Sequence, residues 1–442
     1  MNILLASTPI LGHINPVISL GKILRAAGHD VLFTTGSVFR DRVEAAGLAF
    51  HPLEGAADLD TRDVDALYPE RKELEPGLPR LNFDLNRTFV DVIPAQYSTL
   101  RTILNFFPAD IIVGDTIFTG LLPFLLGAVK NRPAIVSLGI TVMTYRRDDG
   151  APFGPGLPLA VHPAQIQEYE ALSVKVDHEV YEPLKKRVDE MMERFGAQHL
   201  PMPFMDALTA LPDLYLQTGV PGFDYPRSKM PPNVHFVGSL EAKSNHGLSS
   251  NALYLLEEAR RAGKKVVLVT QGTIENRDLD MLLGPTLRAF AGRDDLFVLA
   301  TTGGRALAAV PQPIPDNALV AEYLAFDKVW PMVDLFITNG GYGTVTQALS
   351  EGIPMVVAGT SEEKPEIAAR VAWTGAGIDL RTERPLESEL ASAAARILSE
   401  PSFRMSAERL RAQFKQYDAP REVCSLLTWV ASSFNCQMFD IA

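Results

Sequence analysis

A chain of 442 residues is too long for one ordinary core, and its apolar (47%) and charged (21%) content is typical of a globular protein, so we expect two domains rather than disorder. The formal charge of −12, without a basic cluster that contains aromatics, argues against nucleic acid as a partner. The two cysteines, Cys424 and Cys436, predict neither a disulfide framework nor a thiolate zinc site. No signal peptide is recognisable and the longest apolar run, residues 117–129, is too short to span a bilayer, so we expect a cytoplasmic protein.

The first half of the chain alternates short β-branched runs with amphipathic stretches, the pattern of strand–helix–strand units on a parallel sheet. The runs fall at residues 2–7, 30–35, 110–114 and 134–137. Residues 55–100 and 145–200 interrupt this alternation with aromatics, prolines and charge runs. Such segments are as typical of binding elements as of solvated surface insertions.

A second series of strand-like runs follows in the other half of the chain. It comprises residues 265–270, 296–301, 318–320, 334–338 and 355–358. Between the two series, residues 220–238 are rich in proline, glycine and charge, which predicts a linker. We therefore expect an α/β protein with two doubly wound, Rossmann-like domains, divided as 1–219, 220–238 (linker), 239–423 and a C-terminal segment 424–442. Ligands of open sheets bind at the carboxyl ends of the strands, so the site should lie in a cleft between the domains.

The segment TPILGHINP, residues 8–16, follows the first strand and opens a helix. Gly12 permits a tight turn, which places His13 at the helix N-terminus, facing the cleft. The helix dipole disfavours an imidazolium there, so we expect a neutral ring that acts as a base at pH 7. A histidine that merely caps the helix is the alternative interpretation.

Asp115 follows the apolar run of residues 111–113, so a strand tip brings its carboxylate to the same edge as His13. A carboxylate on one imidazole nitrogen fixes the tautomer and stabilises the cation that forms when the other nitrogen takes a proton. A solvated aspartate that caps the next helix is the alternative.

The segment NGGYGT, residues 339–344, lies between the strand 334–338 and a helix. Its backbone amides and the helix N-terminus predict an anion site suited to a diphosphate, to which Thr344 adds a hydroxyl. Gly343 is expected either to leave room for the diphosphate or to adopt a backbone conformation open mainly to glycine. The segment lacks the features of a P-loop and of a dinucleotide fingerprint, and a glycine turn required only for packing is the alternative.

GHINP, together with VWPMVDLFITNGGYGTVTQALSEGIPMVVAGTSEEKPEIAARV at residues 329–371, resembles the inverting nucleotide-sugar glycosyltransferases of the GT-B fold, the UDP/dTDP-glycosyltransferase family. NGGYGT with EEKPE is more similar to the bacterial antibiotic and macrolide-type subgroup than to the plant one. The resemblance covers nearly the whole chain except residues 55–100. It implies a donor site in the C-terminal domain, an acceptor site in the N-terminal domain, and a helix over 424–442 that returns to the N-terminal domain.

The resemblance also implies residue roles. It makes His13 the catalytic base and Asp115 its partner. The nucleotide and its diphosphate are implied to bind Gly272, Thr273, Tyr323, Asn339, Gly341, Gly343, Thr344 and Gln347, and the donor sugar to bind Glu363 and Lys364. Four residues depart from the family's usual choice: Asn339 replaces histidine, Tyr323 tryptophan, Gln347 glutamate and Lys364 glutamine. These departures leave the choice between a UDP- and a dTDP-sugar open.

The sequence thus predicts transfer of a hexose from a UDP- or dTDP-sugar to a hydroxyl of a small natural product, with inversion, no cofactor and no metal, by a monomer or homodimer. The pairs Asp58 with Asp60 and Asp278 with Asp280 imitate the aspartates by which other glycosyltransferases hold a metal, but their charged surroundings favour solvated faces. A nucleotide-sugar 2-epimerase of the same fold is one alternative, but it has no need of the GHINP histidine. A non-catalytic partner protein is another, but it could tolerate loss of His13 or of the glycine turn, and both are intact here, which argues for activity.

Overall fold

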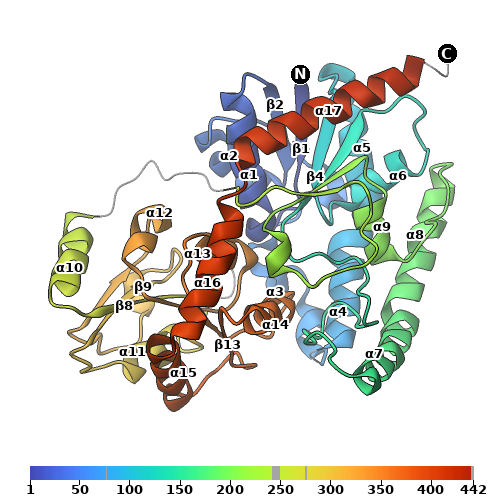
Figure 1. Cartoon of the computed structure of the whole chain (residues 1–442). Coiled ribbons are helices and arrows are strands. Elements are labelled where there is room, and N and C mark those ends of the chain that lie inside the picture. Colours follow the sequence, from blue (N-terminus) through green and yellow to red (C-terminus); the bar gives the residue numbers. More distant parts are fainter. Residues whose placement is uncertain (76, 241–248, 274–275, 440–442) are drawn as a thin grey trace.

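Two parallel β-sheets, one in each half of the chain, organise the fold, and helices cover both (Figure 1). The computed structural model describes residues 1–75, 77–240, 249–273 and 276–439. The parts of the sequence predictions that concern residues 241–248, 274–275 and 440–442 lie outside the described residues. No helix in the described ranges is both long and apolar enough to cross a membrane.

The N-terminal sheet has, in the described part of the chain, seven parallel strands in the order β3-β2-β1-β4-β5-β6-β7. The strands are β1 (Asn2–Ala6), β2 (Asp30–Thr35), β3 (Ala49–Pro52), β4 (Ile111–Asp115), β5 (Ala134–Gly139), β6 (Leu214–Gln217) and β7 (Val234–Phe236). The helices are α1 (Leu11–Ala26), α2 (Arg40–Ala45), α3 (Val64–Leu67), α4 (Leu78–Asp84), α5 (Ile93–Phe106), α6 (Leu122–Leu125), α7 (Pro163–Val176), α8 (Glu182–Arg194) and α9 (Phe204–Ala210).

The C-terminal sheet contains six described strands in the order β10-β9-β8-β11-β12-β13. They are β8 (Lys265–Thr270), β9 (Leu296–Thr301), β10 (Ala318–Ala321), β11 (Leu335–Thr338), β12 (Met355–Val357) and β13 (Gly377–Asp379). The helices of this half are α10 (Ser250–Arg261), α11 (Leu283–Ala289), α12 (Phe326–Val329), α13 (Tyr342–Ser350), α14 (Lys364–Thr374), α15 (Glu387–Ser399) and α16 (Pro401–Phe414), and α17 (Ala419–Phe439) ends the described chain.

The central strands are buried on both faces, as a parallel sheet between two helical layers requires. Every residue of β4, β5, β9 and β11 is buried, which explains why their sequences are nearly continuous apolar runs. All nine strands expected from the sequence are present, and so is the predicted class of two doubly wound sheets. The fold prediction is therefore confirmed at the level of its strands and layers.

The segment predicted as a linker, residues 220–238, instead contains β7, which pairs in parallel with β6. The Asn233 side chain fixes the turn before β7, because its amide donates to the carbonyls of Thr209 and Pro212 at 2.9 and 2.8 Å. The prolines and charges that suggested a linker belong to the loop that leads into this edge strand. The N-terminal sheet thus continues to residue 236.

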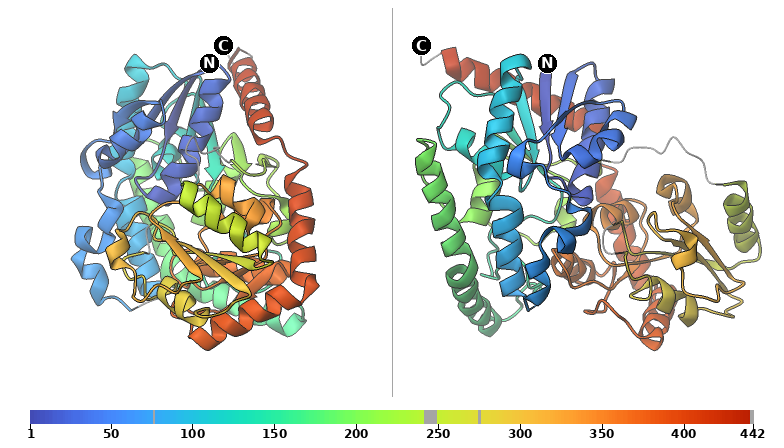
Figure 2. Two further views of the ribbon diagram at one scale, coloured as in Figure 1. Left: turned by 90° about the vertical axis from the view of Figure 1, so that its left-hand side faces the viewer. Right: turned by 180° about the vertical axis from the view of Figure 1, so that it is seen from behind.

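The last helix, α17, returns to the N-terminal half and crosses it on the outside (Figures 1 and 2). Its buried residues Val423 and Leu427 share a core cluster with Ile3 and Leu5 of β1. The helix begins at Ala419, five residues before the expected start at 424. Packing against the first sheet, rather than against its sequence neighbours, stabilises this helix.

Residues 55–100 and 145–200, whose role the sequence left open, form a second layer of helices beside the N-terminal sheet. Helices α4, α7 and α8 lie together in Figure 1, and Leu85, Val180 and Leu184 belong to their shared apolar cluster. This layer extends the N-terminal half toward the cleft. These segments therefore form a packed helical layer with its own apolar core, and not a set of solvated loops.

In both sheets the strands are all parallel, but the order in which they are added changes side at one place. There the chain stops adding strands to one edge of the sheet and continues on the other side of the first strand. In the N-terminal sheet this switch point lies between β1 and β4, and in the C-terminal sheet between β8 and β11. Open α/β sheets bind their ligands at such points, beyond the carboxyl ends of the strands. His13, Asp115 and the predicted diphosphate residues lie at the ends of these four strands, whereas Tyr323 follows β10 and Glu363 and Lys364 follow β12.

Candidate active site

His13 and Asp115 meet at the N-terminal switch point. His13 is the third residue of α1, directly beyond β1, and Asp115 ends β4. The Nδ1 atom of His13 lies 3.1 Å from Oδ1 of Asp115. Because an ionised carboxylate can only accept, Nδ1 must carry the proton, and this leaves Nε2 as the acceptor of a proton from a ligand. The His13 side chain remains 20% exposed, so it is accessible from the cleft.

The carboxylate of Asp115 is fully buried and held by several donors. Its Oδ2 accepts the N–H of Thr8 at 2.6 Å and the hydroxyl of Ser7 at 3.3 Å. Its Oδ1 also accepts the N–H of Ile117 at 3.1 Å. These donors fix the carboxylate in one orientation and thereby fix the ring of His13. Ser7 and Thr8 were absent from the predicted site, although their place directly after β1 was a usable signal.

The pKa of His13 corrects the expectation of a ring held neutral by the helix dipole. Burial lowers the pKa of His13, but the charge and hydrogen bond of Asp115, with Glu363 and Glu362 on the far side of the cleft, outweigh it and raise the pKa above its ordinary 6.5. Burial likewise opposes ionisation of Asp115, yet His13 and the backbone N–H groups hold its pKa below the usual range. The pair is thus an ionised carboxylate beside an unusually basic imidazole.

Phe89 lies beside the His13–Asp115 pair and was not predicted. Its ring stacks on His13 with the centroids 6.3 Å apart and the planes 24° from parallel. Phe89 belongs to a π-helical turn, residues 85–90, whose position the hydroxyl of Thr119 fixes by donating to the Phe89 carbonyl. A single-sequence pattern gives no signal for such a turn. Phe89 places an apolar ring next to His13.

The glycine segment after β11 forms the other switch point, with a geometry that differs in one respect from the prediction. Gly340 has a φ of 96°, and Gly341 caps α13. Gly343 is inside the helix, so the alternative that it needs a conformation open mainly to glycine is wrong. A Cβ at Gly343 would meet nothing within 4 Å, and the residue is exposed. Its absent side chain therefore matters only if a ligand occupies the space in front of the helix.

The N-terminus of α13 presents the features of an anion site. The first N–H groups of a helix have no carbonyl partner within it, and they concentrate positive potential at its start. Thr344 donates its hydroxyl to the Gly341 carbonyl at 3.0 Å, at the start of the helix. Gln347 lies one turn after Gly343 and is partly exposed. These residues share the end of the helix that begins at the switch point.

The turn after β8 is tied to the glycine segment. Asn339 donates its side-chain amide to the Gln271 carbonyl at 2.7 Å, which joins the two turns. Gly272 has a φ of 72° and Thr273 is exposed. Asn276 donates to the carbonyls of Gly272 and Gly303, each at 3.2 Å, which joins the turns after β8 and β9. The Asn339 side chain thus fixes the backbone of the turn after β8 relative to the glycine segment.

Tyr323 follows β10 and is 70% exposed. Its hydroxyl lies over Gly304, because a Cβ at that glycine would come within 2.1 Å of the Tyr323 oxygen. Any side chain at position 304 would displace the ring. Tyr323 therefore offers a free aromatic face at the same edge as the other donor candidates.

Residues 361–364 carry the predicted sugar site between β12 and α14. Glu362 adopts a φ of 55°, which residues with side chains rarely adopt. Lys364 is buried and donates to the Ser361 hydroxyl at 3.1 Å and to Glu362. Burial raises the pKa of Glu362, but Lys364 outweighs it and lowers this pKa, while burial and the Glu362 charge raise the pKa of Glu363. Both carboxylates lie close enough to His13 to affect its titration.

The two aspartate pairs that imitate metal sites are engaged by other groups. Asp60 pairs with Arg62, Asp278 with Arg384 at 2.6 Å and Asp280 with Arg288 at 2.8 Å, while Asp58 accepts the N–H of Ser37 at 2.6 Å. Within the residues that the structure describes, no group of three or more His, Cys, Asp or Glu side chains could hold a metal ion.

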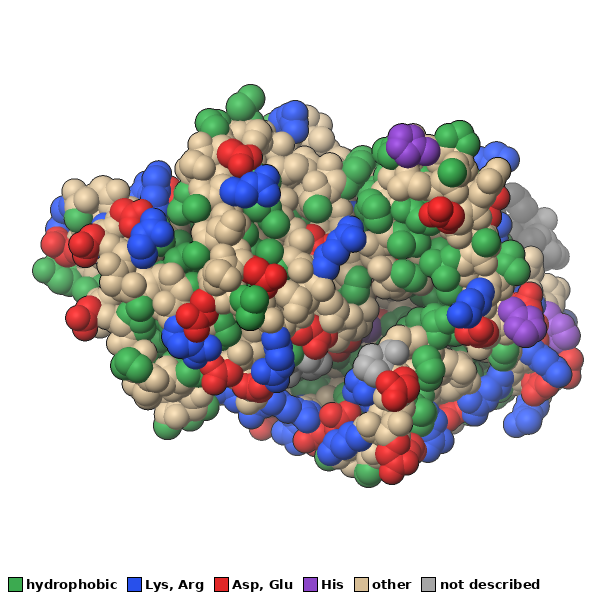
Figure 3. Space-filling view, turned by 90° about the horizontal axis from the view of Figure 1, so that it is seen from below, with side chains coloured by type: hydrophobic (Ala, Val, Ile, Leu, Met, Phe, Trp, Pro, Cys, Tyr) green, Lys and Arg blue, Asp and Glu red, His purple; other side chains and the backbone are tan. Residues whose placement is uncertain are grey.

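The surface is hollowed where the two halves meet, as the view from below shows (Figure 3). The N-terminal half contributes His13 and Asp115, and the C-terminal half contributes Glu362 and Glu363, whose charges reach His13. A partly exposed imidazole on one sheet and a helix N-terminus able to bind an anion on the other suit transfer of a group from a nucleotide. Two doubly wound domains with this arrangement define the GT-B class.

Comparisons with known proteins agree with this class. Residues 289–429 match a family model described as the erythromycin biosynthesis protein CIII-like C-terminal domain. The chain is 34% identical to 4'-demethylrebeccamycin synthase of Lentzea aerocolonigenes, with 96% of this chain and 98% of that protein covered. It is 32% identical to UDP-glycosyltransferase 2 of Phaeomoniella chlamydospora, with 98% and 96% covered.

Among solved structures, the glycosyltransferase of kitacinnamycin matches with a TM-score of 0.71 and 19% identity, over 97% of this chain and 98% of that one. The chain belongs to the UDP-glycosyltransferase family and is a glycosyltransferase of the GT-B fold. The family predicted from GHINP and the glycine segment is therefore confirmed. Since the relatives include a fungal protein, the bacterial subgroup does not describe them all.

Proposed function

We propose that this enzyme transfers a hexose from a UDP- or dTDP-sugar to a hydroxyl of a small natural product, with inversion and with His13 as the general base. One observation carries the proposal: the His13–Asp115 pair lies at the N-terminal switch point with Nε2 left to face the cleft. Neither a 2-epimerase nor a non-catalytic partner requires this pair. Asp115, buried and fully hydrogen-bonded, has no comparable use in a protein that only binds.

In the proposed reaction His13 Nε2 takes the proton of the acceptor hydroxyl. The acceptor oxygen then forms a bond to the anomeric carbon while the bond from that carbon to the diphosphate oxygen breaks on the opposite face. Asp115 stabilises the imidazolium, and general base assistance of this kind contributes about 10²- to 10⁴-fold. A single displacement inverts the configuration of the sugar.

The donor is proposed to bind the C-terminal half. The diphosphate lies on the N–H groups of Gly341, Gly343 and Thr344 and on the turn of Gly272 and Thr273, while the base stacks on Tyr323. Gln347 faces the ribose, and Glu363 and Lys364 face the sugar hydroxyls. Backbone N–H groups at a helix N-terminus supply the positive potential that other enzymes obtain from a cation, so we propose that no metal is needed.

The acceptor is proposed to bind the N-terminal half, next to Phe89. Names that refer to erythromycin and kitacinnamycin among the comparisons support an acceptor of the natural-product class. An apolar ring beside the base suits a hydroxyl carried on an apolar scaffold.

The proposal is tested by incubating the enzyme with UDP- and dTDP-hexoses of α configuration and a panel of hydroxylated aromatic and macrolide acceptors. The anomeric coupling constant of the product, measured by NMR, should show a β linkage. Beforehand, the donor class is found by thermal stabilisation, since a ligand at 100 times its Kd stabilises by about 2.7 kcal/mol. An α-linked product would contradict inversion, and free epimerised nucleotide sugar would indicate the epimerase instead.

A further inference from the structure

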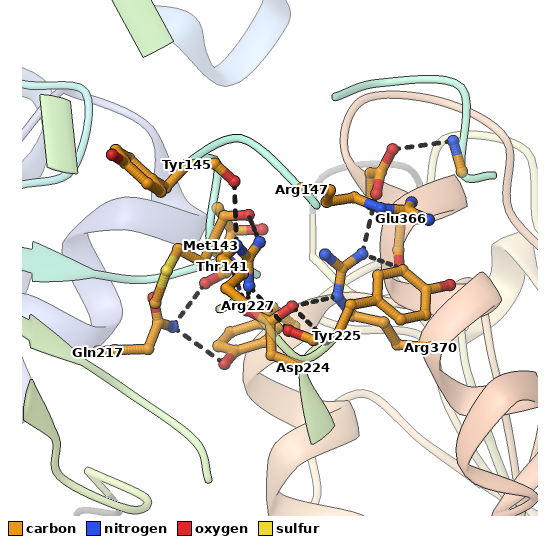
Figure 4. Close-up of polar contacts among 12 residues, drawn as sticks. Thr141, Met143, Tyr145, Arg147, Gln217, Asp224, Tyr225, Arg227, Glu366 and Arg370 are labelled. Carbon is orange, nitrogen blue, oxygen red and sulfur yellow. Dashed lines mark hydrogen bonds and ion pairs between the residues drawn. The ribbon is translucent and has the colours of Figure 1, made fainter. Parts of the chain in front are cut away.

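Buried charges join α14 of the C-terminal half to the N-terminal half of the molecule (Figure 4). Three side chains, Asp224, Glu366 and Arg370, form what we call the interdomain charge cluster. Arg370, which is fully buried, donates Nε to Asp224 Oδ1 and Nη1 to Glu366 Oε2, both at 2.8 Å. Neither Glu366 nor Arg370 takes part in the mechanism above.

Glu366 also binds the backbone of the N-terminal half. Its Oε1 accepts the N–H groups of Gly154 and Gly156, each at 2.9 Å. Both glycines have positive φ angles, 121° and 64°. A Cβ on Gly156 would come within 2.5 Å of the carbonyl of Pro365, so the loop backbone lies directly on the first turn of α14. No side chain separates the two halves at this point.

Asp224 connects the cluster to the chain that follows β5. Its Oδ2 accepts the N–H of Met143 at 3.3 Å and pairs with Arg227 at 3.3 Å. Arg227 donates in turn to the Met143 carbonyl at 3.1 Å. The guanidinium of Arg370 lies 4.4 Å from the centre of the Tyr225 ring. The cluster is therefore anchored on both halves by directional bonds.

A buried cluster of charges is a poor way to gain stability alone, because the cost of removing charges from water often exceeds their attraction. Its hydrogen bonds nevertheless define one position of α14, which apolar packing would specify less strictly. The helix begins at Lys364, and Glu363 is its N-cap. The charges of Glu363 and of the preceding Glu362 reach His13 across the cleft, and Lys364 binds Glu362. Fixing the first turn of α14 therefore fixes the distance between the proposed sugar site and the base.

We propose that Glu366 and Arg370 are positioning residues, which hold the first turn of α14 against the loop of Gly154 and Gly156 and so align Glu363 and Lys364 with His13. The inference rests on the proposed function, since it takes His13 and α14 to act on one reaction. Misplacement of a reacting group by about 1 Å can cost about 10²-fold in rate. The cluster thus acts on turnover from outside the site.

The first test is Glu366→Gln, which keeps the shape and one acceptor oxygen but removes the charge that faces Arg370. We expect kcat to fall by about 10- to 100-fold, while the Kd of UDP or dTDP, measured by calorimetry, stays within about twofold. The acid limb of the pH profile of kcat should also move to lower pH. The charges that face His13 are Asp115 from β4 and Glu362 and Glu363 from the loop before α14, and only the latter two retreat with α14.

A second test leaves the buried charges untouched. Gly156→Ala forces a methyl group against Pro365, whereas Gly196→Ala introduces the same kind of strain, at a φ of 67°, into open space. We expect Gly156→Ala to reproduce the losses of Glu366→Gln and Gly196→Ala to keep kcat within about twofold. If Glu366→Gln and Gly156→Ala lower only the Tm, and keep the parent kcat, KM and pH profile well below that temperature, the proposal is overturned. A parent protein without transferase activity would contradict the proposed function, whereas an active parent with unaffected variants would contradict only the positioning role.

Discussion

At the N-terminal switch point the site consists of side chains, whereas at the C-terminal switch point it consists mainly of backbone N–H groups and small residues. The imidazole of His13 is fixed by Asp115, and Asp115 by the atoms of Ser7, Thr8 and Ile117. At the other switch point Gly343 is exposed and a side chain there would have free space. Under the proposed function, the same topology therefore supports chemistry on one sheet and binding on the other.

The difference predicts how each half responds to substitution. A fixed, buried pair loses function when its chemistry changes, even if binding is intact. A backbone site loses function when access to it is blocked, even if the fold is intact. Substitutions at the N-terminal switch point should consequently lower the rate, and substitutions at the C-terminal switch point should lower the affinity for the nucleotide.

The largest effect is expected for His13→Ala. Removal of the proposed base should lower kcat by about 10²- to 10⁴-fold, because the assistance in taking the acceptor proton is lost. The Kd of the nucleotide, measured by calorimetry, should change by less than about twofold. A variant with the parent rate would remove His13 from the mechanism, and one that loses nucleotide binding would contradict the division between the sheets.

Asp115→Asn should lower kcat by roughly 10²-fold or more, because an amide no longer fixes the tautomer or stabilises the imidazolium. It should also move the acid limb of kcat. The base must be neutral, so the rate falls as pH drops through the pKa of His13, which Asp115 raises above 6.5. Without that charge the pKa falls, and the limb should shift to lower pH in a rate profile. An unchanged limb would mean that another group controls it.

Gly343→Val should affect affinity instead of rate. Loss of one charge-assisted hydrogen bond, worth roughly 1.5 to 3 kcal/mol, weakens the nucleotide by about 10- to 150-fold. Gly343→Ala should weaken it less, and should slightly raise the Tm of the unliganded protein, because glycine is a poor helix former. Calorimetry and thermal melting test both. Parent affinity in a folded Gly343→Val variant would place the diphosphate elsewhere.

The smallest effect is expected from removal of metal ions. If N–H groups alone balance the diphosphate, excess chelator should leave kcat and the donor KM within about twofold. Steady-state rates in chelator, with and without added magnesium or manganese, give the answer. Activity that chelator abolishes and either ion restores would show that the C-terminal site relies on a cation and not on its backbone.

The sequence did not reveal four short strands, β3, β6, β7 and β13, although it did reveal β10 and β12, which are equally short. The four have three or four residues each, too few to show a period, and each contains a polar residue, a proline or a glycine, whereas β10 and β12 are entirely apolar. β13, Gly377–Asp379, includes glycine and aspartate, which strands disfavour. Their pairing with a formed neighbour, rather than their own propensity, makes them strands.

The site divides in the same way. His13, Asp115 and the glycine segment could be predicted because each directly follows a recognisable strand, so local sequence places it at a switch point. Phe89 could not, because its place depends on how residues 55–100 pack, and the interdomain charge cluster could not, because it joins Asp224 and the loop of Gly154 and Gly156 to the distant helix α14. The expectation that the helix dipole keeps His13 neutral missed the carboxylates that raise its pKa, because Asp115 ends β4 while Glu362 and Glu363 come from a loop of the other half of the chain.

The return of α17 to the first sheet also constrains the order of folding during synthesis. Val423 and Leu427 complete the apolar cluster that includes Ile3 and Val17, yet nearly two hundred residues of the second domain are made in between. At about 5–20 residues per second, the first domain waits on the order of ten seconds or more with that surface uncovered. A nascent chain stalled before residue 419 should therefore bind a chaperone through the face that α17 later covers.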